Sequence, residues 1–179
     1  GAQGDMLGEL QILREQLSAR HDLAATEQSG FLDRYNLAAT HTAIGNLLMQ
    51  MGDSQGALKN QREGLRQREQ IAAQDPDTAR AQSALTISYE YVGLAMDQTG
   101  DTEGALQVQQ RGQQMRESLV ASDPLNIDLR LMLNESHRYV GDLLLKRGDR
   151  DGARDHYRKQ LELTRAMVKA EPANAQFRH

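Results

Sequence analysis

The sequence predicts an all-α fold, a right-handed superhelical solenoid of antiparallel helix pairs with about seven long helices. Three observations predict this fold. Gly-Asp pairs return with a 48-residue period, an acidic residue followed by proline returns with the same step, and the apolar residues between them recur with helical spacing. A stack of repeats needs little core, which suits a chain that is 39% hydrophobic and only 4% aromatic.

The Gly-Asp pairs define the repeats. Gly52, Gly100 and Gly148 are evenly spaced, and each is followed by Asp and, one helical turn later, by a second Gly and an Ala. One step earlier stands Gly4, so the chain opens inside the turn of an earlier repeat. We therefore expect a single domain over 1–179 that belongs to a longer array. Its parts are a partial repeat at 1–30 and full repeats at 31–78, 79–126 and 127–174.

Each repeat opens with an amphipathic helix. Thr78, Asn126 and Asn174 stand at the expected N-caps, where a side-chain oxygen can accept from the first backbone N–H groups, and Gly30 holds that place in the first repeat. The helix ends near residue 50, 98 or 146, because the glycine of the turn adopts the left-handed conformation that such an end requires. A 4-3-4 spacing places the core residues along one face. They are Leu37, His41, Ile44 and Leu48, then Leu85, Tyr89, Val92 and Met96, then Leu133, His137, Val140 and Leu144.

A second helix follows the turn in each repeat. It begins near residue 53, 101 or 149 and ends at the acidic residue before proline, because proline disfavours helical geometry in the residue that precedes it. The partial repeat adds one more helix of this kind. The expected total is four helices of the second kind and three of the first.

The first helix and the turn carry a motif that resembles the tetratricopeptide repeat. In the first repeat it reads His41-x-x-Ile44-Gly45-x-x-Leu48, with Ala57 following in the next helix. This is similar to the family pattern aromatic-x-x-Leu-Gly-x-x-Tyr followed by Ala-x-x-x-Phe. The motif returns twice, around Gly93 and Ala105 and around Gly141 and Ala153. The small residues predict close contact between the paired helices.

Two departures from the family pattern stand out. The 48-residue period exceeds the family's usual repeat length by nearly four helical turns, so each helix is about two turns longer. The family's final aromatic is replaced by Gln61 and Gln109 and survives only as Tyr157, so we expect the packing to differ there. Long repeats of this kind resemble arrays in bacterial signalling proteins, some of them attached to protein kinases.

Composition disfavours several function classes. The net charge is −4, and no segment holds the basic block that a nucleic-acid partner requires. No apolar run approaches the roughly 18 residues of a membrane span, and the N-terminal residues lack the apolar segment of a signal peptide. The absence of Cys fits a reducing compartment. We therefore expect a cytoplasmic protein with no nucleic-acid or membrane partner.

The sequence offers little catalytic chemistry. Residues 52–56 spell the G-x-S-x-G motif of serine hydrolases, but a helix precedes them, and Thr102 and Arg150 replace Ser54 in the later repeats. His41 and His137 share the register of Tyr89, so we interpret them as packed amphipathic residues with one satisfied nitrogen; the other histidines, His156 included, fall at unrelated positions. We expect no enzymatic activity, no metal and no cofactor.

The resemblance implies that the first helices line a concave groove that binds a peptide or helix of a partner protein. Helical phase then selects the groove positions, one residue away from the core stripe. They are Tyr35, Thr42 and Asn46, then Ile87, Glu90 and Leu94, then Leu131, Glu135, Arg138 and Asp142. Asp142 lies one helical turn after Arg138, close enough to pair with it.

The predicted function is thus a non-catalytic scaffold for protein–protein interaction. Two alternatives remain open. The chain could be a regulatory or sensor segment of a larger signalling enzyme, for example a bacterial protein kinase. It could also be a homo-oligomerisation module that associates head to tail through exposed apolar ends.

Overall fold

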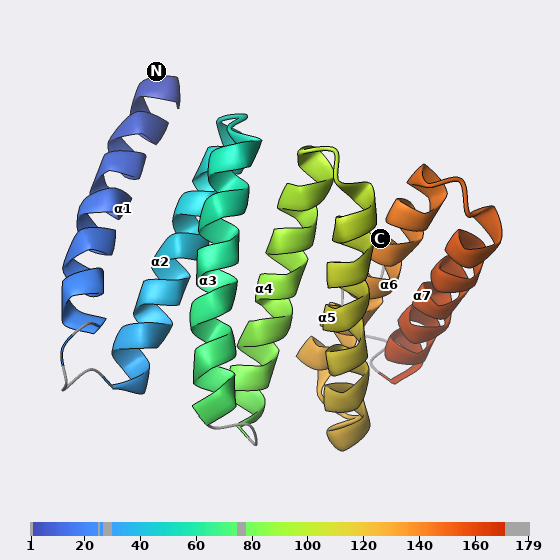
Figure 1. Cartoon of the computed structure of the whole chain (residues 1–179). Helices are drawn as coiled ribbons and strands as arrows, with labels where there is room; N and C mark the ends of the chain where they lie inside the picture. Colours follow the sequence, from blue (N-terminus) through green and yellow to red (C-terminus); the bar gives the residue numbers. More distant parts are fainter. Residues whose placement is uncertain (1, 25, 27–29, 75–77, 171–179) are drawn as a thin grey trace. The chain divides into compact units, whose positions relative to one another are not determined.

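The computed structural model describes residues 2–24, 26, 30–74 and 78–170 (Figure 1). These residues form seven α-helices and no strand, as the sequence predicts. The helices are α1 (Ala2–Ala24), α2 (Phe31–Gln50), α3 (Ser54–Gln74), α4 (Ala79–Gln98), α5 (Thr102–Ser122), α6 (Ile127–Lys146) and α7 (Arg150–Ala170).

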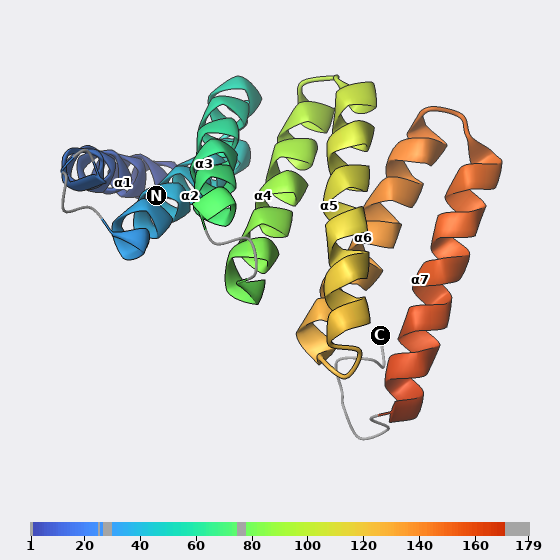
Figure 2. The ribbon, with the colours of Figure 1, turned by 60° about the horizontal axis from the view of Figure 1, so that its bottom comes forward.

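The chain divides into two compact units, Gly1–Asp101 with α1 to α4 and Thr102–His179 with α5 to α7. Within each unit consecutive helices run antiparallel and pack on one another (Figure 1). In the first unit α2 also contacts α4 directly, so two first helices of successive repeats meet. The hairpin of α6 and α7 in the second unit is clear in Figure 2. The prediction of a single domain and the prediction of a right-handed superhelix both concern the two units together. Both therefore stay predictions.

The Gly-Asp turn ends one helix and starts the next. Gly52 has a φ of 84° and Gly148 a φ of 89°, the left-handed geometry predicted for these glycines. The N–H of Asp53 then donates to the carbonyl oxygen of Leu48 at 2.9 Å, as in a Schellman motif. The Asp53 carboxylate in turn accepts from the N–H of Gly56 at 2.8 Å and caps α3. The glycine's role agrees with the prediction, whereas the cap was not predicted; Asp149 repeats it at the start of α7.

The predicted N-caps of the first helices are confirmed at Gly30, Thr78 and Asn126. Asn174 lies outside the described residues. The Asn126 side-chain oxygen accepts from the N–H of Leu129 at 3.2 Å, whereas Thr78 makes no side-chain capping bond.

We expect Asn126→Ala to lower the free energy of unfolding by about 1 kcal/mol, because the first turn of α6 loses an acceptor for one of its backbone N–H groups. Chemical denaturation measures the change. Asn126→Ser keeps a capping oxygen and is the matched control. Equal losses in both variants would mean that the cap does not stabilise α6.

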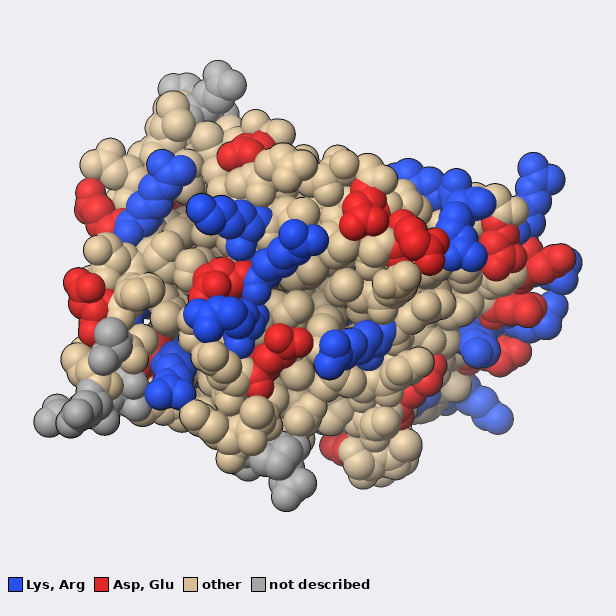
Figure 3. All heavy atoms as spheres, viewed as in Figure 1, with Lys and Arg blue, Asp and Glu red and all other residues tan. Residues whose placement is uncertain are grey.

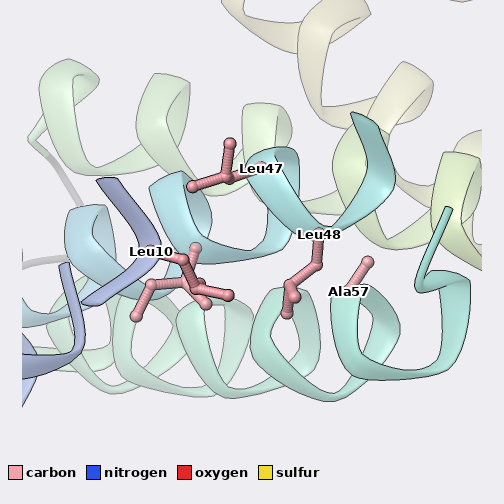
Figure 4. Packing of buried hydrophobic residues seen from close by; sticks show 5 residues of the cluster. Leu10, Leu47, Leu48 and Ala57 are labelled. Carbon is pink, nitrogen blue, oxygen red and sulfur yellow. The ribbon is translucent and has the colours of Figure 1, made fainter. Parts of the chain in front are cut away.

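The core of the first unit is built from residues of three helices. Leu10 of α1, Leu47 and Leu48 of α2, and Ala57 of α3 belong to one buried cluster (Figure 4). Ala57 is completely buried, which agrees with its predicted place in a close contact between helices.

The outer surface carries charges of both signs. In the face shown in Figure 3, Lys and Arg side chains alternate with Asp and Glu side chains. Charges are dense on α7, where Arg154 pairs with Asp151 and Arg158 with Asp155. Such exposed pairs stabilise the fold little.

Candidate functional site

The first unit brings Tyr35 of α2 and Arg80 of α4 together. The Arg80 guanidinium carbon lies 5.2 Å from the centre of the Tyr35 ring, within range of a cation–π interaction. Tyr35 also stacks on Phe31, with ring centres 5.9 Å apart, and Phe31 is 41% exposed. Aromatic and Arg side chains thus lie side by side on a surface shared by two first helices.

The predicted positions of α4 continue this surface. Arg80, Ile87 and Leu94 follow one another at intervals of two helical turns, so all three lie on one side of α4. Ile87, Glu90 and Leu94 are half-buried. We name the surface of Tyr35, Asn46, Arg80, Ile87, Glu90 and Leu94 the α2/α4 face.

The structure places Thr42 inside the packing and not on a surface. Its hydroxyl donates to the carbonyl oxygen of Ala38 at 3.1 Å and accepts from Nη1 of Arg68 at 3.2 Å. Only 9% of Thr42 is exposed. Helical phase predicts Thr42 as a groove position, and this prediction is wrong, because α3 covers the residue and removes it from the α2/α4 face.

The side chain of Asn46 is hydrogen-bonded to a residue of α3, the second helix of its own repeat. The Gln61 side chain passes over Gly45, where an added Cβ would lie 2.5 Å from Nε2 of Gln61. Nε2 then donates to the Asn46 side-chain oxygen at 2.8 Å. Nε2 also donates to the carbonyl oxygen of Thr42 at 3.3 Å, so the space over the glycine is filled by a hydrogen-bonded amide and not by a ring. This agrees with the expectation that packing differs where Gln replaces the family's aromatic.

The second unit repeats this arrangement with Tyr157. An added Cβ on Gly141 would lie 2.7 Å from Cε1 of Tyr157, whose hydroxyl donates to Oδ1 of Asp142 at 2.7 Å. Burial, together with the hydrogen bond to Asp142, raises the pKa of Tyr157 to about 12. The phenol therefore remains a hydrogen-bond donor throughout the ordinary pH range, and it positions Asp142.

The four predicted residues of α6 form a charged patch, which we name the α6 face. It consists of Leu131, Glu135, Arg138 and Asp142. The Arg138 guanidinium donates to Oε2 of Glu135 at 2.8 and 3.0 Å and to Oδ2 of Asp142 at 3.1 Å. The predicted pairing of Arg138 with Asp142 is confirmed. Because one guanidinium serves two carboxylates, the α6 face has a net negative charge.

A ladder of arginines, which was not predicted from the sequence, joins successive repeats. Arg20, Arg68 and Arg116 hold equivalent positions on the second helices, and each reaches a hydroxyl of the first helix that follows. The acceptors are Thr40, at 2.6 Å from Arg20, then Ser88, and then Ser136, at 2.6 Å from Arg116. Arg20 and Arg116 also donate to the carbonyl oxygens of Asn36 and Met132. The 48-residue step of both partners was the signal that could have revealed the ladder.

Two members of the ladder are buried. Arg68 is 7% exposed and Arg116 only 2%. Burial lowers the pKa of Arg68, although an arginine remains charged at any physiological pH. Two hydroxyl acceptors at Arg68, and a hydroxyl and a carbonyl oxygen at Arg116, therefore help to hold a buried cation at each of these two junctions between repeats.

The histidines of the core stripe are packed, as predicted. Nδ1 of His41 lies 3.2 Å from the side-chain oxygen of Asn60, so it carries the hydrogen. Nδ1 of His137 lies 3.3 Å from Nδ1 of His156, and sequence reasoning did not foresee that contact. Among the described residues, no group of three or more His, Cys, Asp or Glu side chains could hold a metal ion.

A cleft of about 570 Å³ opens between α1, α2 and α3, and its lining contains no residue of the α2/α4 face. It is lined by His21, Ala24, Arg34, Leu37, Gln67, Gln70, Ala73 and Gln74. Its lining offers no nucleophile beside His21, so it lacks the paired groups of acyl-transfer chemistry. None of the helices in the described part of the chain is long and apolar enough to span a membrane.

Comparison with known proteins supports the fold. The structure is similar to the crystal structure of BtubC (BKLC) from P. vanneervenii, with a TM-score of 0.64 and 16% sequence identity over 90% of this chain. The match spans 57% of the length of BtubC. The crystal structure of MamA matches at 17% identity over 94% of both chains, but its TM-score of 0.35 supports no structural argument. No protein-family model and no curated protein matches the sequence.

Proposed function

We propose that this chain is a non-catalytic scaffold that binds a peptide or helix of a partner protein on the α2/α4 face. The observation that carries this proposal is the contact between Tyr35 and Arg80, which joins two first helices into one partly apolar surface. Tyr and Arg are enriched among residues that dominate binding energy, and Ile87 and Leu94 add apolar contact beside them. The α6 face is a second contact surface.

The charges of the two faces favour a basic or mixed-charge partner segment. The α2/α4 face contains Glu90, and the α6 face contains Glu135 and Asp142, both engaged by Arg138. A Lys or Arg of the partner can replace part of these contacts, which gives specificity and faster association. The alternating charges in Figure 3 and the net charge of −4 support a protein partner over nucleic acid. We place the interaction in the cytoplasm, without a membrane partner or cofactor.

Glu90→Lys is expected to weaken binding of the natural partner by about 1 kcal/mol or more, roughly a fivefold rise in Kd, because it reverses a charge inside the interface. The partner is first isolated with the intact chain, and isothermal titration then compares the two proteins. The thermal melt should change little.

Glu162→Lys is the matched control, because Glu162 is an exposed residue of α7 outside both faces. It changes the net charge equally and should leave Kd unchanged. If Glu90→Lys binds with the wild-type Kd, the α2/α4 face is not the binding site. If both variants weaken binding equally, long-range charge accounts for the effect.

Exposed apolar residues favour self-association as a second candidate function. Ile12 and Leu23 lie on one side of α1 and are 57% and 52% exposed, and Leu161 of α7 is 47% exposed. A helix face of this kind can bury itself against another copy in a head-to-tail contact. Sedimentation velocity over a wide concentration range tests this. A constant monomer mass would rule it out over that range.

A further inference from the structure

In the second unit, two histidine rings meet at the contact between α6 and α7. Nδ1 of His137 and Nδ1 of His156 lie 3.3 Å apart, and the ring centres are 5.3 Å apart. His137 is 4% exposed and His156 is half-buried. Because the two nitrogens face each other, only one of them can carry a hydrogen while the other accepts it.

The charged groups around the pair come from both neighbouring helices. Burial lowers the pKa of His137 to about 4; His156 and Lys159 add to the effect, and Glu117 of α5 opposes it. Burial also lowers the pKa of His156, again with Lys159, while Glu117 and Asp155 oppose the shift. Both rings are therefore neutral at pH 7.

Earlier repeats provide natural comparisons at the same positions. His41 faces Asn60, whose side-chain oxygen accepts from Nδ1 of His41 whether that ring is neutral or charged. Tyr89 stands where the next repeat has His137, and its hydroxyl donates to Oε1 of Glu69 at 3.0 Å. Only the pairing of two histidines makes the contact depend on which nitrogens carry protons.

We propose that the His137–His156 contact is an acid-sensitive latch that holds α7 on α6 and opens when both rings are protonated. The first proton leaves the contact intact, because one imidazolium can donate its Nδ1–H to the neutral partner. The second proton places two N–H donors face to face and two positive charges in a buried contact. The two rings therefore titrate as a coupled pair.

The direction in which pH changes the stability of the latch follows from proton uptake by His137 and His156 in the folded and unfolded chain. The unfolded chain takes up protons near pH 6.5, whereas the folded pair resists them, so the latch is fully closed above about pH 6.5 and weakens as the pH falls toward 4. Opening also moves Tyr157, which follows His156 on α7 and holds Asp142. The α6 face would change with it, but the latch itself does not depend on any partner.

Hydrogen exchange of the full chain between pH 7 and pH 4, corrected for the intrinsic pH dependence of exchange, tests the latch. In the wild type, protection of α7 amides is expected to fall at least about tenfold more than protection of α3 amides. His156→Asn copies the His41–Asn60 pair. His137→Tyr copies Tyr89, and Glu117, which holds the position of Glu69 in the next repeat, can accept from its hydroxyl. In each variant, protection of α7 amides should fall less than about twofold more than protection of α3 amides.

An equal loss of α7 protection in the wild type and both variants would assign the effect to other titrating groups and overturn the proposal. If a variant does not fold, nitrogen-15 NMR of the wild-type imidazoles decides the question. We expect His137 and His156 to titrate in two coupled steps below pH 6.5. Independent titration of the two rings near pH 6.5 would show that no latch exists.

Discussion

Arg116→Ala is expected to lower the free energy of unfolding of the second unit by about 2–4 kcal/mol. Arg116 is 2% exposed, and its Nη1 donates to the hydroxyl of Ser136 and the carbonyl oxygen of Met132. Removing the side chain leaves a cavity at the junction of α5 and α6 and takes a donor from two acceptors. The loss exceeds the gain from no longer burying a cation, because the alanine cannot fill the space.

Chemical denaturation, with hydrogen exchange to locate the loss in α5 and α6, measures this effect. Arg116→Met keeps most of the volume without a buried charge, and the Ser136 hydroxyl keeps its own hydrogen bond to Met132 at 2.9 Å. Arg116→Met should lower the free energy of unfolding by less than about 1.5 kcal/mol. Arg165→Ala, at an exposed position of α7, should change stability by less than about 0.5 kcal/mol. An Arg116→Ala variant as stable as Arg165→Ala would mean that the ladder does not join the repeats.

Gly141→Leu should also be strongly destabilising, by about 3 kcal/mol. An added Cβ alone would lie 2.7 and 3.0 Å from ring atoms of Tyr157, and a full leucine side chain forces α6 and α7 apart. The rigid ring cannot bend away as a flexible chain can. Tyr157 would also lose its hydrogen bond to Asp142, so the α6 face would change together with the packing.

Two alanine variants distinguish the steric effect of the added side chain from the effect of helix propensity on stability. Gly45→Ala meets the flexible end of Gln61, which can swing aside, so the propensity gain of up to about 1 kcal/mol offsets much of the clash. Gly141→Ala meets the Tyr157 ring and should be less stable than wild type by about 1–2 kcal/mol. Tyr157→Gln, which copies the first repeat, should recover part of that loss. Equal thermal melts for the two alanine variants would show that the ring is not what limits the space.

Local sequence determined the helices, their ends and most of their caps. The Gly-Asp turn depends on hydrogen bonds that stay within little more than one helical turn of the chain, such as those from Asp53 to Leu48 and from Gly56 to Asp53. A left-handed glycine and a capping side chain act within that distance wherever they occur. The regular repetition of these signals is why the limits of α2 to α7 could be predicted nearly correctly. The expected turn at Gly4 and Asp5 is wrong, because both residues lie inside α1.

The faces of the helices were predicted only in part. Tyr35, Ile87 and Leu94 lie on surfaces as helical phase indicates, and the i,i+4 pair of Arg138 and Asp142 is local. Thr42 differs, because its exposure depends on how closely α3 approaches. A periodic pattern indicates which residues share a side of a helix, but it does not show how far a neighbouring helix extends over the edge of that side.

Tertiary structure alone decided the contacts that distinguish one repeat from another. Arg116 reaches Ser136 over 20 residues, and His137 meets His156 over 19. Such contacts depend on the rotation and spacing of two packed helices, and a shift of one residue in either helix turns a side chain by about 100°. The sequence could therefore determine that these polar residues recur, and only packing could determine which of them meet and which are buried.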